Sequence, residues 1–248
     1  SIGFIIAAVS LGFVIDSYGQ RALIFALLIT QLIIFLLAFT LPKKKIIYKI
    51  ENKRSIWPVL RRKEVIVLML SCALMVSSHG FLYNFYSIFL EQKGYSGSTI
   101  GILWSIGVIF EILVFLMMPR ILKKFTLKEV LLVSMGFAVV RFFLIGTYVD
   151  SIAILILAQT MHAATYGSFH VASIQLIAHF FYNEHQARGQ TLYNSITYGV
   201  GGTIGGLGGG YMIGYFGIAN TFIFSALLPL IGFFVLLLGL KTSFKAKI

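Results

Sequence analysis

The sequence predicts an all-α protein, a polytopic transmembrane helix bundle, and two observations carry that prediction. Hydrophobic residues make up 58% and charged residues 11% of the 248 residues, whereas about 25% of residues are charged in soluble domains. The apolar residues also form eight long runs, and Lys and Arg collect in alternate gaps between these runs. Together these features exclude an ordinary soluble domain and indicate a chain that crosses a membrane repeatedly.

The number of spans follows from run length, because a helix needs roughly 20 apolar residues to cross the hydrocarbon core. The predicted spans are 1–17, 21–41, 65–90, 98–118, 130–148, 151–178, 190–215 and 218–240. The one sizeable break is the basic segment 42–64, and we place a domain division there. The two spans in 1–41 would end one helical half, the six spans in 65–240 would form the other, and 241–248 would be a tail.

The basic residues predict how the spans are oriented. Seventeen of the 20 Lys and Arg residues lie in the segment 42–64, in two later alternate gaps and in the tail. Only Arg21 and Lys93 lie in the other gaps, and Arg141 lies within a span. Cytoplasmic loops carry such an excess of Lys and Arg. We therefore expect a multi-pass protein of the cell membrane, in particular a bacterial inner membrane, with the linker 42–64 and the C-terminus in the cytoplasm.

Three segments are distinctive: GILWSIGVIFEI at 101–112, MHAATYGSFH at 161–170 and RGQTLYNS at 188–195. With these segments the chain resembles the major facilitator superfamily, and most closely its phenylpropionate-permease-like branch, near the nucleoside–proton symporters. The resemblance implies that the eight spans correspond to spans five to twelve of a six-plus-six transporter. Because Ser1 already lies within an apolar run, we expect a fragment that lacks four helices upstream.

A short motif, Gly12-x-x-x-Asp16-x-x-Gly19-x-Arg21, resembles the superfamily's cytoplasmic loop signature between its second and third helices. If this motif faced the cytoplasm, the basic linker would lie outside, against the distribution of 17 basic residues. We therefore predict that the motif lies at the opposite end of the bundle from the linker, as a turn with an Asp16–Arg21 contact.

Four ionisable side chains lie within predicted spans, where a charge costs roughly 2.5–3.5 kcal/mol on insertion scales. They are His79, Glu111, Arg141 and His162, with His170 a weaker fifth. Glu111 would couple transport to protons if its carboxyl changed protonation with water access, or it would hold helices together by pairing. Arg141 could pair with Glu111 at a similar depth in a helical hairpin, or bind a substrate carboxylate. Each histidine could relay protons or form a structural hydrogen bond.

Aromatic side chains crowd two of the spans. Tyr83, Tyr86 and Tyr166, together with His170, could line a pocket for an aromatic acid or a nucleobase, or could serve as packing and interfacial residues. Asn84 lies among them, and an amide within a span needs either a hydrogen-bonding partner or a ligand.

Glycines recur every four residues in the span 190–215, and Gly201, Gly205 and Gly209 form one such series. This spacing lets helix backbones touch, so we expect close packing, with gating as the alternative. His162 and His170 would lie about 80° apart around an ideal helix, and the chain carries no metal or haem motif. The sequence therefore predicts neither a metal site nor a cofactor.

These features predict a proton-coupled permease, a symporter that moves a small organic solute by alternating access. The resemblance implies an aromatic acid such as phenylpropionate, with a nucleoside as the alternative. Two other classes stay open: an integral membrane enzyme, which would need a catalytic constellation that is not visible, and a non-transporting sensor or scaffold. Expected partners are the solute, protons, the lipid bilayer and the missing N-terminal helices. The net charge of +12 reflects topology rather than nucleic-acid binding.

Overall fold

The computed structural model describes residues 2–41, 55–182, 185–241 and 244–245, and every regular element within these ranges is helical. The helices before the basic linker are α1 (Ile2–Tyr18) and α2 (Ala22–Ala38). The elements after it are α3 (Trp57–Leu60), α4 (Lys63–Gln92), α5 (Gly97–Lys124), α6 (Leu127–Thr147), α7 (Ile152–Thr160), the π-helical η1 (Ala163–Gly167), α8 (Ser168–Phe180), α9 (Gln186–Asn194), the π-helical η3 (Ser195–Gly201) and η4 (Ile204–Gly208), α10 (Gly209–Ser225) and α11 (Leu227–Gly239). The predicted all-α membrane bundle is thereby confirmed, while most of the linker 42–64 lies outside the described residues.

Five helical stretches within the described ranges are long and apolar enough to cross a membrane, and α1 and α2 are apolar but shorter. The last of the five, Gln186–Gly239, has 54 residues and is too long for one crossing. Gly217 divides it, because its backbone has φ 73° and ψ 165°, a conformation that glycine adopts without the steric penalty of a Cβ atom. The predicted boundary between the spans 190–215 and 218–240 falls at this residue.

Local sequence signals explain where two long helices begin. The Ser96 hydroxyl accepts a hydrogen bond from the Thr99 N–H at 3.2 Å at the start of α5. Thr126 and Glu129 form a capping box at the start of α6, in which each side chain accepts a hydrogen bond from the other residue's backbone N–H. Such caps satisfy N–H groups that have no partner inside the helix.

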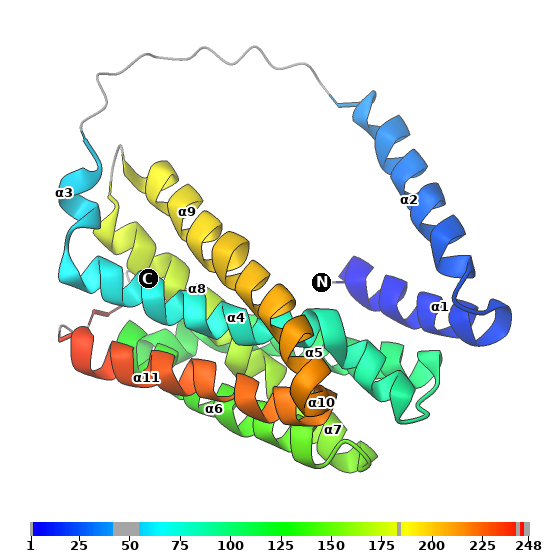
Figure 1. Ribbon diagram of the computed structural model, residues 1–248. Coiled ribbons are helices and arrows are strands. Elements are labelled where there is room, and N and C mark those ends of the chain that lie inside the picture. Colours follow the sequence, from blue (N-terminus) through cyan, green and yellow to red (C-terminus); the bar gives the residue numbers. More distant parts are fainter. Residues whose placement is uncertain (1, 42–54, 183–184, 242–243, 246–248) are drawn as a thin grey trace.

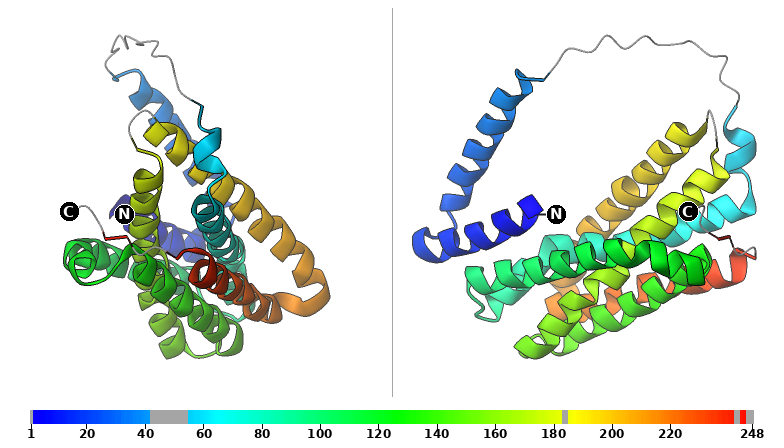
Figure 2. Two further views of the ribbon diagram at one scale, coloured as in Figure 1. Left: turned by 90° about the vertical axis from the view of Figure 1, so that its left-hand side faces the viewer. Right: turned by 180° about the vertical axis from the view of Figure 1, so that it is seen from behind.

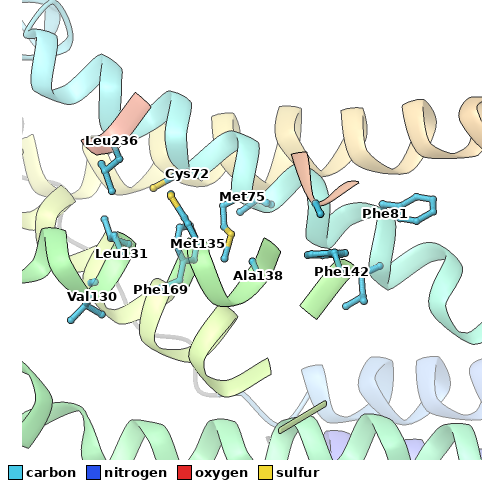
Figure 3. Close-up of a cluster of buried hydrophobic side chains, with 14 of the residues drawn as sticks. Cys72, Met75, Phe81, Val130, Leu131, Met135, Ala138, Phe142, Phe169 and Leu236 are labelled. Carbon is cyan, nitrogen blue, oxygen red and sulfur yellow. The ribbon is translucent and has the colours of Figure 1, made fainter. Parts of the chain in front are cut away.

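The hydrophobic core lies among the helices that follow the linker, and α4 has the largest buried share of the spanning helices. Figure 1 shows α4 running between α11 on one side and α8 and α9 on the other. Cys72 and Met75 of α4 meet Met135 of α6, Phe169 of α8 and Leu236 of α11, all completely buried (Figure 3). Apolar side chains thus fix the relative positions of the elements that carry the candidate site.

The turns between α1 and α2, α4 and α5, and α6 and α7 lie together at one end of the bundle, which we call the far end. There the Lys93 ammonium lies 3.0 Å from an Asp150 carboxylate oxygen, and the Tyr95 hydroxyl donates to the Val149 carbonyl at 2.9 Å. At the opposite end, the linker end, the Leu127 N–H donates to the Phe244 carbonyl at 2.9 Å.

The hairpin of α1 and α2 is attached to the remaining bundle mainly through α1, which packs along α5. Gly12 is the one buried residue of α1, and α2 has none. Figure 2 shows α2 leaning away from the bundle formed by α4 to α11. The apolar surface of α2 is therefore available to lipid or to further helices.

The predicted glycine packing occurs along α4. A Cβ atom on Gly201 would lie 2.7 Å from the Ala73 carbonyl oxygen, and one on Gly205 would lie 1.9 Å from the Ser77 carbonyl oxygen. A Cβ atom on Gly209 would lie 2.1 Å from the Phe81 ring. This series therefore lies where two helices touch, as its spacing predicts.

The two faces of this glycine-rich segment should respond differently to an added methyl group. We expect Gly205→Ala to lower the thermal unfolding midpoint, because overpacking typically costs about 1–3 kcal/mol. Gly208 has open space around it, so Gly208→Ala should leave the midpoint unchanged or raise it, since alanine favours a helix by roughly 0.5–1 kcal/mol. Thermal melts of the two variants in one detergent compare them directly, and equal effects would contradict the packing assignment.

Candidate functional site

A buried guanidinium lies at the centre of the candidate site. Arg141 of α6 has 0% of its surface exposed. Its Nε donates to the Ala158 carbonyl at 2.8 Å, and one terminal nitrogen donates to the Gln159 amide oxygen at 3.1 Å. The other terminal nitrogen lies 3.0 Å from His162 Nδ1 and 3.3 Å from the Thr165 hydroxyl. These contacts hold α6 against the chain from α7 to η1.

The Arg141 contact fixes the state of the neighbouring histidine. Because a guanidinium has only donors, His162 Nδ1 must accept, and the ring proton of the neutral imidazole then lies on Nε2. That atom lies 3.4 Å from a Glu111 carboxylate oxygen. Glu111 therefore reaches Arg141 through His162 and does not touch it, so the directly paired arrangement considered from sequence is absent from the described contacts.

Small residues allow α5 to approach this network closely. A Cβ atom on Gly107 of α5 would lie 3.1 Å from the Gln159 amide oxygen and 3.4 Å from His162. Gly107 and Glu111 are four residues apart and so lie on the same face of the helix. Opposite Glu111, a Cβ atom on Gly167 would lie 3.2 Å from the Glu111 side chain. The Glu111 side chain retains 14% of its surface exposed.

Three aromatic rings stack along the segment that contains the π-helical element η1. His162 and Tyr166 stack with an interplanar angle of 6°, and Tyr166 and His170 stack with an angle of 15°. A π-helix bonds residue i to i+5, so each residue turns less than in an α-helix. The offset of about 80° between His162 and His170 was predicted for a regular α-helix, and the π-helical turn lies between these two residues.

His79 lies beside this stack in a different hydrogen-bonding state. Its Nδ1 lies 3.0 Å from the Met75 carbonyl oxygen, and must therefore donate a proton to it. Its Nε2 is buried and has no hydrogen-bonding partner among the described residues. The His79 ring lies 5.7 Å from the Tyr166 ring and 6.2 Å from the His162 ring, measured between centroids. The two histidines that look equivalent in sequence thus differ in which ring nitrogen carries the proton.

The predicted pocket residues fall into two groups. Tyr83 is 45% exposed and stacks on Trp104 at a centroid distance of 5.8 Å, and its ring meets the Tyr166 ring edge-on at 6.1 Å. Asn84 is also exposed, and its amide nitrogen donates to the Gly80 carbonyl at 2.6 Å. Tyr86 is fully buried and packs edge-on against Trp104. This burial favours the packing role that the sequence left open for Tyr86 beside pocket lining.

Several residues of the network did not stand out in the sequence. Gln159 and Thr165 bind Arg141, and the Tyr198 hydroxyl of η3 lies 3.1 Å from His170 Nδ1. Gln159 could have been found from the sequence, because it lies three residues before His162 and so shares a helix face with it. Tyr198 gave no such signal, because nothing in the sequence relates η3 to α8.

The described residues contain no group of three or more His, Cys, Asp or Glu side chains placed to hold a metal ion. The charge of Arg141 is met instead by carbonyl, amide, hydroxyl and imidazole groups, with one carboxylate behind them. These acceptor groups around one cation, with Glu111 next to them, suit proton exchange at Glu111 and hydrogen bonding to a polar solute.

A bundle of apolar helices with a polar network buried between them is the architecture of an integral membrane protein, not of an ordinary soluble domain. Comparison with protein families supports this class, because the model of the MFS_1 like family matches residues 1–224. The chain therefore belongs to this family of major facilitator transporters, in agreement with the prediction of a transporter rather than an enzyme.

Two bacterial proteins are similar to the chain. One is the "Probable 3-phenylpropionic acid transporter" of Escherichia coli (strain K12), 28% identical over 182 residues, which cover 72% of this chain and 48% of that protein. The other is the "Uncharacterized transporter YwbF" of Bacillus subtilis (strain 168), 26% identical over 244 residues, which cover 98% of this chain and 61% of that protein. The chain thus spans about half to three-fifths of the length of these relatives.

The bridged arrangement of Glu111, His162 and Arg141 should appear as energetic coupling. We expect Arg141→Met and Glu111→Gln each to destabilise the protein, because each single change leaves an uncompensated group. The double variant should lose less stability than the sum of the two single losses. Coupling energies within one network are about 0.5–3 kcal/mol. Thermal melts of the four proteins measure this term, and strict additivity would contradict the bridge.

Proposed function

We propose that the chain is the C-terminal part of a proton-coupled secondary transporter for a small organic anion. In this proposal α1 and α2 end the N-terminal helical half, the segment 42–64 is the cytoplasmic linker, and α4 to α11 form the C-terminal half. The distribution of basic residues then places the linker end and the tail in the cytoplasm of a bacterial inner membrane, and the far end outside.

The observation that carries the proposal is the contact of Glu111 with a histidine whose other nitrogen is occupied by a buried arginine. With Glu111 ionised, its charge balances that of Arg141 through the neutral ring of His162. When Glu111 takes up a proton, the Arg141 charge loses this balance, and an anion nearby becomes favourable. Proton and organic anion would then bind together, which is the differential affinity that coupling requires.

The exposed polar and aromatic groups suit a solute with a ring and a carboxylate. The rings of Tyr83 and Trp104 stack on each other beside the network. Aromatic rings favour offset or edge-to-face contact with a further ring. The Asn84 amide nitrogen donates to Gly80, and among the described residues its amide oxygen has no hydrogen-bonding partner. The name of the Escherichia coli relative, a probable 3-phenylpropionic acid transporter, supports an aromatic acid over the nucleoside that the sequence left open.

Uptake into proteoliposomes tests the proton-coupling role of Glu111. With the full-length protein and a panel of aromatic acids and nucleosides, we expect an inward pH gradient to drive accumulation of an aromatic acid. Glu111→Gln should reduce gradient-driven accumulation at least about tenfold, the effect of roughly 1.4 kcal/mol, while exchange of labelled for unlabelled solute persists.

Glu64→Gln is the matched control, because this partly exposed carboxylate lies in the first turn of α4. It should accumulate solute as the wild type does. Retention of gradient-driven accumulation by Glu111→Gln would overturn the coupling role. Uptake of nucleosides alone would overturn the substrate class and leave proton coupling intact.

A second test distinguishes a bridging His162 from one that exchanges protons. Glutamine also presents an acceptor and a donor side by side, so His162→Gln could accept from Arg141 and donate to Glu111 without titrating. We expect it to keep gradient-driven uptake within about tenfold of the wild type, whereas His162→Leu should lose it. Equal loss in both variants, at equal expression, would show that His162 itself must carry the coupled proton.

A further inference from the structure

The seam between α1 and α5 joins the two helical halves of the proposed transporter. A Cβ atom on Gly12 would lie 2.5 Å from the Gly97 carbonyl oxygen, and one on Gly101 would lie 2.3 Å from the Ala8 carbonyl oxygen. The two backbones therefore touch over at least one helical turn. This contact leaves no room for side chains between the helices at the far end.

Asp16 closes this seam by capping the helix on the other side. Its carboxylate oxygens accept hydrogen bonds from the Gly97 N–H at 2.6 Å and the Ser98 N–H at 2.8 Å. The third N–H of α5, that of Thr99, donates to Ser96. The N-terminus of a helix carries a partial positive charge and unpaired donors, so a carboxylate from another helix binds there favourably. The predicted Asp16–Arg21 contact is therefore replaced by this longer-range one.

A second polar contact crosses the same boundary one turn further along. The Gln20 amide nitrogen donates to a carboxylate oxygen of Glu91, at the end of α4. The far-end ion pair of Lys93 and Asp150 stays on one side of the boundary, because both residues belong to the unit from α4 to α11. Two side chains of the α1–α2 hairpin thus hold two helix ends of the following unit.

We infer that Asp16 and the N-terminus of α5 form a clasp that holds the far end of the transporter closed. In alternating access the two halves rock about a central site, so a contact that crosses the boundary at one end must break when that end opens. The clasp should therefore stabilise the state open at the linker end. This inference rests on the alternating-access part of the proposed function, but not on proton coupling or on the identity of the solute.

Access to the central face can be measured without any solute. In intact cells that express the full-length protein with Tyr83→Cys, a membrane-impermeant maleimide reports how often this exposed position is reached from outside. Loss of a capping side chain costs roughly 0.5–2 kcal/mol. We therefore expect Asp16→Ala to increase the labelling rate at position 83 by about two- to thirtyfold.

Asp150→Ala is the matched control, because it removes a carboxylate from the same end of the bundle whose partner, Lys93, lies in the same half. It should leave the labelling rate at position 83 unchanged. An unchanged rate in Asp16→Ala, or an equal increase in both variants, would overturn the clasp. Either result would leave the uptake experiments on Glu111 unaffected, so failure of the clasp is distinct from failure of the proposed function.

A crosslink tests the clasp even if Asp16→Ala folds poorly. In a variant with Asp16→Cys, Ser98→Cys and Tyr83→Cys, oxidation should join positions 16 and 98 and fix the far end closed. Mass spectrometry of the peptide that contains position 83 measures its labelling. We expect the labelling rate to fall at least about tenfold on oxidation, which corresponds to about 1.4 kcal/mol, and to recover when the disulfide is reduced. The inference would be overturned if the crosslinked protein were labelled at position 83 as fast as the same protein before oxidation.

Discussion

The candidate site depends on one constraint, the burial of the Arg141 cation among membrane helices. A charge removed from water is tolerated only when hydrogen bonds satisfy it, and four groups from α7 to η1 accept from this guanidinium. The constraint extends outward, because the bond to His162 Nδ1 turns that ring's remaining N–H toward Glu111. The orientation of the carboxylate at the exposed edge thus follows from the position of the cation in the interior.

Departures from regular helix geometry make this network possible. The π-helical η1 brings His162, Tyr166 and His170 into one stack, and Gly107 permits the approach of α5. π-helical turns occur frequently at functional sites, because they direct side chains where regular spacing would not. The same reasoning applies to η3, which presents the Tyr198 hydroxyl to His170.

Helix α5 connects the far-end clasp with the candidate coupling carboxylate. Gly97 at its first position binds Asp16, and Glu111 lies 14 residues later, about 21 Å along the helix at 1.5 Å per residue. Between them Trp104 contacts Phe4 of α1 on one side and Tyr83 of α4 on the other. Because a helix is stiff over this length, a movement of α5 at the seam would also change the surroundings of Glu111.

The sequence by itself determined the helical class, the division at Gly217 and the identity of the ionisable residues within the spans. These features follow from hydrophobic run length and from the cost of placing a charge in an apolar span, both of which are local. Only the tertiary structure decided that His162 separates Glu111 from Arg141, that Tyr86 is buried, and that Asp16 binds α5 instead of Arg21. Such pairings depend on which helix faces meet and on a π-helical turn that shifts the register of a face, and no local pattern specifies either of them.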